Sequence, residues 1–135
     1  MIQSLPNIID IYQVPCSLLT PNISEQFRAK MPIRITRQIT PIEHFGNASC
    51  EAEQQYEDGG YSEKTVLQFN TTEDISQYPP LAFVITDAQG QSYVIGAKEA
   101  PYPMVEIIKV IDKDTNGKSV KVTFTRRKSL IPCVI

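Results

Sequence analysis

The sequence predicts a mainly β protein, an antiparallel β-sandwich or partly open barrel of about seven strands. Short apolar or alternating segments recur with turn residues about every 8 to 12 positions, which is typical of such folds. The chain has 135 residues, of which 41% are hydrophobic, so it can bury one core. We therefore expect a single domain over residues 1–135, with a β core over residues 33–135.

Residues 1–32 are predicted to form an extended or irregular arm, because prolines are concentrated at this end of the chain. Each proline removes a backbone donor and biases the preceding residue toward extended geometry. Residues 22–30 fit either one short helix, capped by Asn22 or Ser24, or irregular chain. Apolar side chains of the arm must be buried somewhere, and we expect Ile8, Ile11 and Tyr12 to contact a partner. Burial on the domain's own core is the open alternative. Five of the ten prolines lie in the first 41 residues: Pro6, Pro15, Pro21, Pro32 and Pro41.

The predicted β core begins with a strand over residues 33–40, where Ile33, Ile35 and Ile39 share one parity. Three hairpins follow, each with a turn signal between its strands. The central pair is the apolar segment 81–87 with 92–97, joined through Gly90. The other two hairpins join residues 49–58 to 63–70 and residues 104–111 to 119–127.

A possible calcium site lies in the turn between the last two predicted strands, at Asp112, Asp114 and Asn116. Oxygen ligands at alternate positions followed by glycine match the first half of a calcium loop. The twelfth position is Thr123, where such a loop needs a bidentate glutamate. An Asn-Gly hairpin turn explains the pattern better, so no metal or other cofactor is expected.

No catalytic signature is present, and we expect a protein that is not an enzyme. His44 and Cys50 could form a catalytic pair in which the histidine activates the cysteine as a nucleophile. Nearby Glu43, Glu51 and Glu53 would instead raise the pKa of the Cys50 thiol, which argues against this role. Acidic residues could in principle cleave a glycoside, yet there is no tryptophan to stack a sugar. Phosphate-binding glycine loops and GxSxG are absent from the sequence.

Charge is segregated along the chain, although the formal net charge is only -2. Nine acidic residues and one basic residue, Lys64, lie between Glu43 and Asp87. Arg126, Arg127 and Lys128 form a basic end, and we expect it to contact a partner protein. It lacks outward aromatic residues, so nucleic acid is not an expected partner. The two segments either meet complementary charges on partner subunits or neutralise each other within one sheet.

The expected cellular compartment is inferred from three features: hydrophobic runs, the N-terminal segment and the cysteines. No apolar run approaches the roughly 18 residues of a membrane span, and no basic segment precedes the first apolar residues. The three cysteines are an odd number at wide spacing, which does not suit a disulfide framework. We expect a cytoplasmic protein with no membrane partner.

A series of short features follows in order from about Gly46 onward: Cys50-Glu51, Gly60-Tyr61, Leu67-x-Phe69, the segment 81–90, Tyr93-Val94-Ile95-Gly96, and Pro101 or Pro103. In these features the chain resembles small β proteins from tail and virion-assembly modules of bacterial prophages. The resemblance implies a non-enzymatic assembly subunit or tail accessory protein that forms homo-oligomers or binds phage structural proteins and can be assembled into a virion. A monomeric ligand-binding module for calcium or a carbohydrate is the alternative.

Overall fold

The computed structural model shows a chain folded mainly as β-strands, with one short helix among the residues it describes. It describes residues 2–4, 7–19, 21–31, 33–35, 39–57, 60–73, 75, 80–99, 102–109, 117–126 and 129–134.

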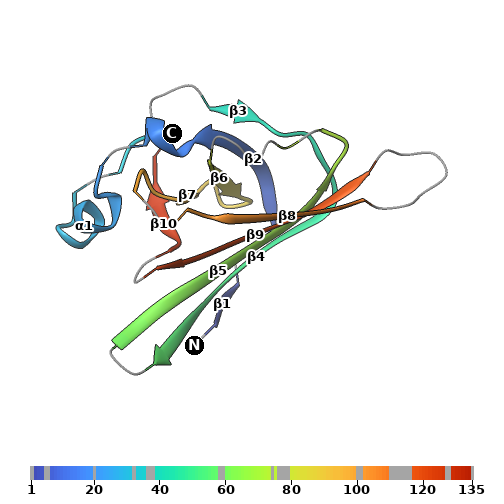
Figure 1. Cartoon of the computed structure of the whole chain (residues 1–135). Coiled ribbons are helices and arrows are strands. Elements are labelled where there is room, and N and C mark those ends of the chain that lie inside the picture. The colour runs from blue at the N-terminus through green and yellow to red at the C-terminus, as the bar shows by residue number, and fades with distance from the viewer. Residues whose placement is uncertain are drawn as a thin grey trace.

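Two antiparallel sheets of five strands each make up the fold (Figure 1). The first sheet contains, in spatial order, β1 (Ile2–Ser4), β4 (His44–Glu57), β5 (Gly60–Thr71), β9 (Lys118–Arg126) and β8 (Met104–Lys109). The second sheet contains β10 (Ile131–Cys133), β7 (Ser92–Ile95), β6 (Leu81–Asp87), β2 (Ile8–Pro15) and β3 (Thr40–Pro41). The mainly β class, as a sandwich or partly open barrel, is therefore confirmed.

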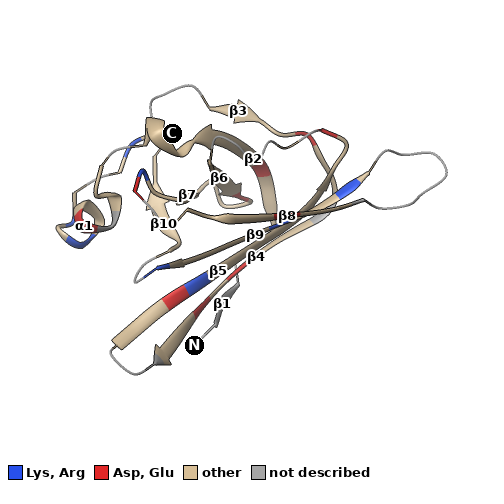
Figure 2. Cartoon of the chain, in the orientation of Figure 1, with Lys and Arg blue, Asp and Glu red and all other residues tan. Residues whose placement is uncertain are grey.

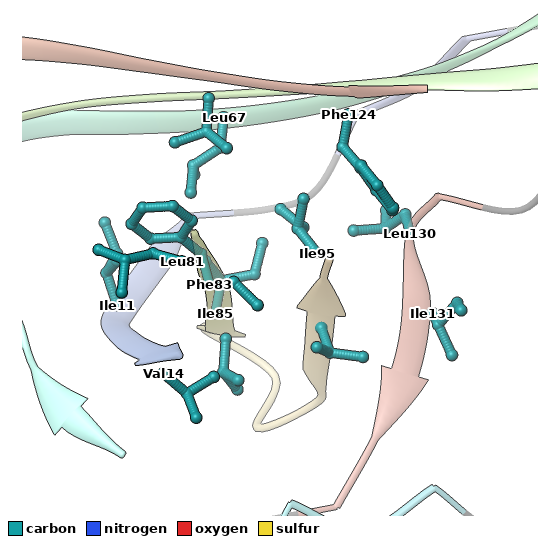
Figure 3. Packing of buried hydrophobic residues seen from close by; sticks show 14 of the residues in the cluster. Ile11, Val14, Leu67, Leu81, Phe83, Ile85, Ile95, Phe124, Leu130 and Ile131 are labelled. Atoms are coloured by element: carbon teal, nitrogen blue, oxygen red, sulfur yellow. The ribbon is translucent and has the colours of Figure 1, made fainter. Parts of the chain in front are cut away.

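The core lies between the two sheets, and both contribute large side chains that are almost fully excluded from solvent (Figure 3). Leu67 and Phe124 point from the first sheet toward Phe83 and Ile95 of the second. The Phe69 and Phe83 rings meet at a centroid distance of 6.4 Å with tilted planes, a favourable arrangement for aromatic pairs. Burying apolar surface on both inner faces is the main force that holds the sheets together.

The three predicted hairpins are confirmed within the described residues. β4 pairs with β5, β6 with β7, and β8 with β9, all antiparallel. Val120, Val122 and Phe124 face inward as predicted, because alternate residues of a strand point to one face. The first hairpin is longer than expected, since β4 starts at His44 and β5 runs from Gly60 to Thr71.

The prediction of an irregular arm is wrong for residues 8–15, which form β2 between β6 and β3. Ile8 and Ile11 do not lie on a partner-facing surface as predicted, since they are 8% and 1% exposed and belong to the core. Tyr12 also packs against this core and is only half-buried. The strand survives in a proline-rich region because Pro15 is its last residue, where a missing donor does little harm.

The strand predicted for residues 33–40 is also wrong for residues 33–35, while Thr40 does belong to a strand, β3. Ile33 and Ile35 are buried, as the alternation indicates, but only Arg34 forms an isolated parallel bridge, to Val134. The Ile35 amide donates to Val134 O and the Val134 amide donates to Ile33 O, each at 2.9 Å. Among the described residues of this segment, ladder pairing is found at β3, so the apolar period at Ile33 and Ile35 reflects burial rather than a ladder.

The short helix is present as α1 (Ile23–Arg28), preceded by a 3-10 turn, η1 (Cys16–Leu18). Asn22 is the N-cap residue by position, but its side chain makes no capping hydrogen bond to the helix. Its backbone is left-handed, with φ 55°, and its amide donates to Glu99 Oε1 at 3.0 Å. Ile23, which is 1% exposed, anchors the start of the helix to the core.

Gly96 sits where the second sheet is most crowded, directly after β7. A Cβ there would lie 2.4 Å from Ala82 Cβ, and the backbone φ of 140° is unfavourable for other residues. We expect Gly96→Ala to lower the free energy of unfolding by about 1–3 kcal/mol through overpacking and strain. Chemical denaturation measures this loss.

Gly90→Ala is the matched control, because Gly90 has a φ of 88° but no neighbouring atom within 4 Å of the position that a Cβ would take. It adds strain without a clash and should cost clearly less than Gly96→Ala. Equal losses in the two variants would show that the close approach to Ala82 has no energetic consequence.

Candidate contact surfaces

The proposed His44 and Cys50 pair is not assembled into a nucleophilic site. Both residues lie on β4, six positions apart, which corresponds to on the order of 20 Å along an extended strand. Cys50 is 2% exposed, and burial, followed by nearby Glu51 and Glu63, raises the pKa of its thiol to about 12. A thiol in this state is not available as a thiolate near neutral pH.

All three cysteines are free and buried in the core. Burial raises the pKa of Cys16 to about 11 and that of Cys133 to about 12. These side chains act as small apolar groups in the packing rather than as reactive groups.

Thiol alkylation tests this state of the cysteines. A thiol with a pKa near 12 is ionised to roughly one part in 10,000 at pH 8, whereas an ordinary thiol is ionised substantially. We expect iodoacetamide to label the native chain very slowly at pH 8, and faster as the pH rises toward the raised pKa values. The unfolded chain should label fast at all three positions, as seen by mass spectrometry. Rapid native labelling of Cys50 would contradict its buried placement.

The candidate calcium ligands Asp112, Asp114 and Asn116 lie outside the described residues. Within the described part of the chain, no three His, Cys, Asp or Glu side chains gather as a metal site requires. No described helix is long and apolar enough to cross a membrane.

The acidic and basic segments become neighbours in the first sheet, because β5 pairs with both β4 and β9. Glu53 lies opposite Lys64, and Glu106 of β8 lies opposite Lys121 of β9. Acidic and basic positions accordingly follow each other on β5 in Figure 2. Each of these pairs joins opposite charges of the same segment. Among the described pairs, Glu63↔Arg126 sets the acidic segment against the basic one, so neutralisation within the sheet, one of the two alternatives that the sequence leaves open, is supported at that position.

Arg126 is predicted to face a partner, but its guanidinium group is used inside the chain. Nη2 donates to the Glu99 backbone oxygen at 2.6 Å, and the group lies 5.6 Å from the centroid of the Phe124 ring. The residue is half-buried. Arg127 and Lys128, the other two members of the predicted basic end, lie outside the described residues.

One of the acidic residues considered for glycoside cleavage and expected on a solvated strand face, Glu63, is instead buried, and it links β5 to the chain between β9 and β10. Glu63 is 5% exposed, and its Oε1 accepts hydrogen bonds from the amides of Ser129 at 2.9 Å and Leu130 at 2.8 Å. The Ser129 hydroxyl donates to the same oxygen at 3.2 Å. Glu63 shares its parity on β5 with the buried Thr65, Leu67 and Phe69, which is the signal that could have found it. Its role is structural, since it holds the chain where it enters the second sheet.

Among the described residues, the most exposed aromatic side chains lie at the end of the β4–β5 hairpin. We call residues 54–57 and 60–62 the hairpin tip. β5 pairs with β9 only from Glu63 to Thr71, so the tip residues are paired across the hairpin alone among the described residues. In Figure 1 this end of the two strands extends beyond the second sheet.

Two tyrosines complete the core-facing rows of the hairpin at its tip. Tyr56 continues the row of Cys50 and Ala52 on β4, and Tyr61 continues the row of Glu63 on β5. They are cross-strand partners, with ring centroids 4.9 Å apart and an interplanar angle of 59°. Because the second sheet does not cover this end, Tyr56 and Tyr61 remain 73% and 69% exposed. No sequence signal indicates this pair, since its exposure depends on where the facing sheet stops.

A pocket of about 620 Å³ lies between α1 and β10, and we call it the α1–β10 pocket. Its wall is mainly apolar, with buried Ile33 and Cys133 and the exposed Met31. Arg28 and Lys30 are exposed and supply positive charge. Its volume falls in the usual range for small-molecule sites, about 300–1,000 Å³. The lining residues are Phe27, Arg28, Lys30, Met31, Ile33, Gln91, Pro132, Cys133 and Val134.

Comparisons of this chain with protein-family models, with curated proteins and with solved structures find no match. The resemblance to prophage tail and virion-assembly proteins therefore stays a prediction from the sequence. The function has to be argued from the surfaces described above.

Proposed function

We propose that this protein is a non-enzymatic structural or assembly subunit that works through protein–protein contacts. The observation that carries the proposal is the exposed Tyr56–Tyr61 pair at a hairpin tip that extends beyond its own core. Tyrosine is enriched at protein interfaces because its ring buries a large area while its hydroxyl group can keep a hydrogen bond. The sequence resemblance supports the finer proposal of a prophage tail or virion accessory protein, made in the cytoplasm.

The chemistry of the described residues supports the same proposal. The Cys50 thiol, the candidate nucleophile, is buried and has a raised pKa. The best-organised polar cluster, around Glu63, has its acceptor oxygen occupied by backbone amides and a hydroxyl group. Large exposed side chains are found instead on the hairpin tip and on β8, where Met104 and Ile108 are 66% and 63% exposed.

A ligand-binding module is the second candidate, and the α1–β10 pocket is the observation that favours it. Its apolar wall and two nearby cations suit a small amphipathic anion better than a calcium ion. A carbohydrate would need stacking aromatic rings, whereas Phe27 is the only aromatic residue in the lining.

Native mass spectrometry across a protein dilution series tests the proposal against this alternative. An assembly subunit should give oligomers whose fraction grows with concentration, because association follows mass action. Monomers alone at every concentration, together with a small molecule retained from the expression host, would contradict self-assembly and favour the ligand-binding module.

A further inference from the structure

We propose that the hairpin tip of one copy inserts into the α1–β10 pocket of a second copy. The inference rests on the proposed assembly function and names the partner and both surfaces. The occupant is thus a specified segment, Tyr56 and Tyr61 with the strand ends that carry them.

Shape supports this pairing. The tip is a narrow two-stranded projection with two tilted rings in contact, and the pocket is a hollow of about 620 Å³. Pockets of this size enclose a body about as large as a drug molecule, which is also the scale of two phenol rings. The wall contributed by Met31, Ile33 and Pro132 offers apolar and sulfur contacts to aromatic rings.

Charge supports it as well. Glu51 and Glu53 are exposed on β4 just before the tip, and Lys64 lies opposite Glu53 on β5. These strand positions carry two negative charges against one positive charge, whereas Arg28 and Lys30 supply positive charge at the pocket. A symmetric contact between two tips would instead bring like charges together, which disfavours it.

Each copy has one tip and one pocket. Two copies that exchange tips reciprocally form a closed dimer, and contacts that do not close in this way continue as a larger ring or a filament. Two side chains in a pocket form a small contact, so we expect a weak association that depends on concentration and decreases with added salt.

Substitutions on each surface test the contact by sedimentation velocity with the full chain. Tyr56→Ser with Tyr61→Ser removes the rings, and Arg28→Glu with Lys30→Glu reverses the charge of the pocket. Each double variant should weaken self-association about tenfold or more, because buried tyrosine and arginine side chains dominate interface energies. Tyr102→Ser and Lys98→Glu are the matched controls, since both residues are exposed and neither belongs to the tip or the pocket lining. The controls should associate as the unmodified chain does, and circular dichroism should show that every variant is folded.

Mixing the two defective variants gives the sharper test. The tyrosine variant keeps an intact pocket and the charge-reversed variant keeps an intact tip, so an equimolar mixture should form one-to-one dimers and stop there. This complementation requires that the tip of one copy binds the pocket of another.

Three results would overturn the inference. If both double variants form oligomers as the unmodified chain does, the contact lies elsewhere on the surface, and the proposed assembly function is unaffected. Loss of association in the charge-reversed variant only would show that another segment occupies the pocket. An unmodified chain that is monomeric at all concentrations would remove the inference together with self-assembly.

Discussion

Deleting residues 1–21 should abolish cooperative folding of the domain. The deletion removes β1 and β2, and with β2 the antiparallel ladder that runs from Ile8↔Asp87 to Pro15↔Leu81. It also removes the buried Ile8, Ile11, Val14 and Leu19. At roughly 1.5–3 kcal/mol for each such side chain, the loss is on the order of 10 kcal/mol. That is comparable to the whole stability of a small domain, about 5–15 kcal/mol.

Thermal melts followed by circular dichroism and light scattering measure the outcome. The truncated chain should show no cooperative transition, or should aggregate. A chain lacking only residues 1–4 is the control, because it loses just the three-residue edge strand β1 and should still melt cooperatively. A truncated 22–135 chain that melts cooperatively close to the full-length temperature would contradict the placement of β2 inside the second sheet.

Glu63→Ala should have the second largest effect, a loss of about 3–5 kcal/mol in the free energy of unfolding. The substitution leaves the Ser129 and Leu130 amides without the acceptor that Glu63 Oε1 provides. Buried donors that lose an acceptor cost more than the hydrogen bond itself contributed, because they no longer have water either. Urea denaturation at neutral pH gives the difference.

Two variants show whether the loss comes from the acceptor. Glu63→Gln keeps a side-chain oxygen of similar reach and should lose less than Glu63→Ala. Glu53→Ala removes an exposed carboxylate from the neighbouring strand and should change stability by less than about 0.5 kcal/mol. Similar small losses for Glu53→Ala and Glu63→Ala would contradict a structural role for the buried carboxyl group.

Alternation and turn residues are sufficient to predict the hairpins. β6 and β7, for example, are apolar and are joined by a turn in which Asp87 Oδ1 accepts the amides of Gln89 and Gln91. Local signals conflict at β2, where the frequent prolines indicate irregular chain while Ile8, Ile11 and Val14 are apolar, and the burial of these side chains prevails. They mislead again at Ile33 and Ile35, where burial against β10 produces the period of a strand without its pairing. The local sequence indicates which residues are buried, but the strand that pairs with a segment is determined by the tertiary fold.

The contact surfaces could be predicted less well than the fold. Two of the expected contact residues, Ile8 and Ile11, are in the core, and a third, Arg126, binds the Glu99 backbone. The Tyr56–Tyr61 pair follows the inward parity of its strands, so the sequence pattern makes it look like core. The pair is exposed because the first sheet extends further than the second at this end. The alternation of apolar residues along a strand does not show how far the facing sheet extends. The α1–β10 pocket likewise joins segments that are about a hundred residues apart in the sequence.

Hydrogen exchange at two protein concentrations tests most directly whether this protein works through contacts at the hairpin tip. At low concentration the amides of residues 54–57 and 60–62 should exchange fast, because the tip is paired across the hairpin alone among the described residues. At high concentration we predict slower exchange in these residues and around α1 and β10, with β6 and β7 unchanged. Identical exchange at both concentrations, while oligomers are present, would contradict the assignment of the tip as the contact surface.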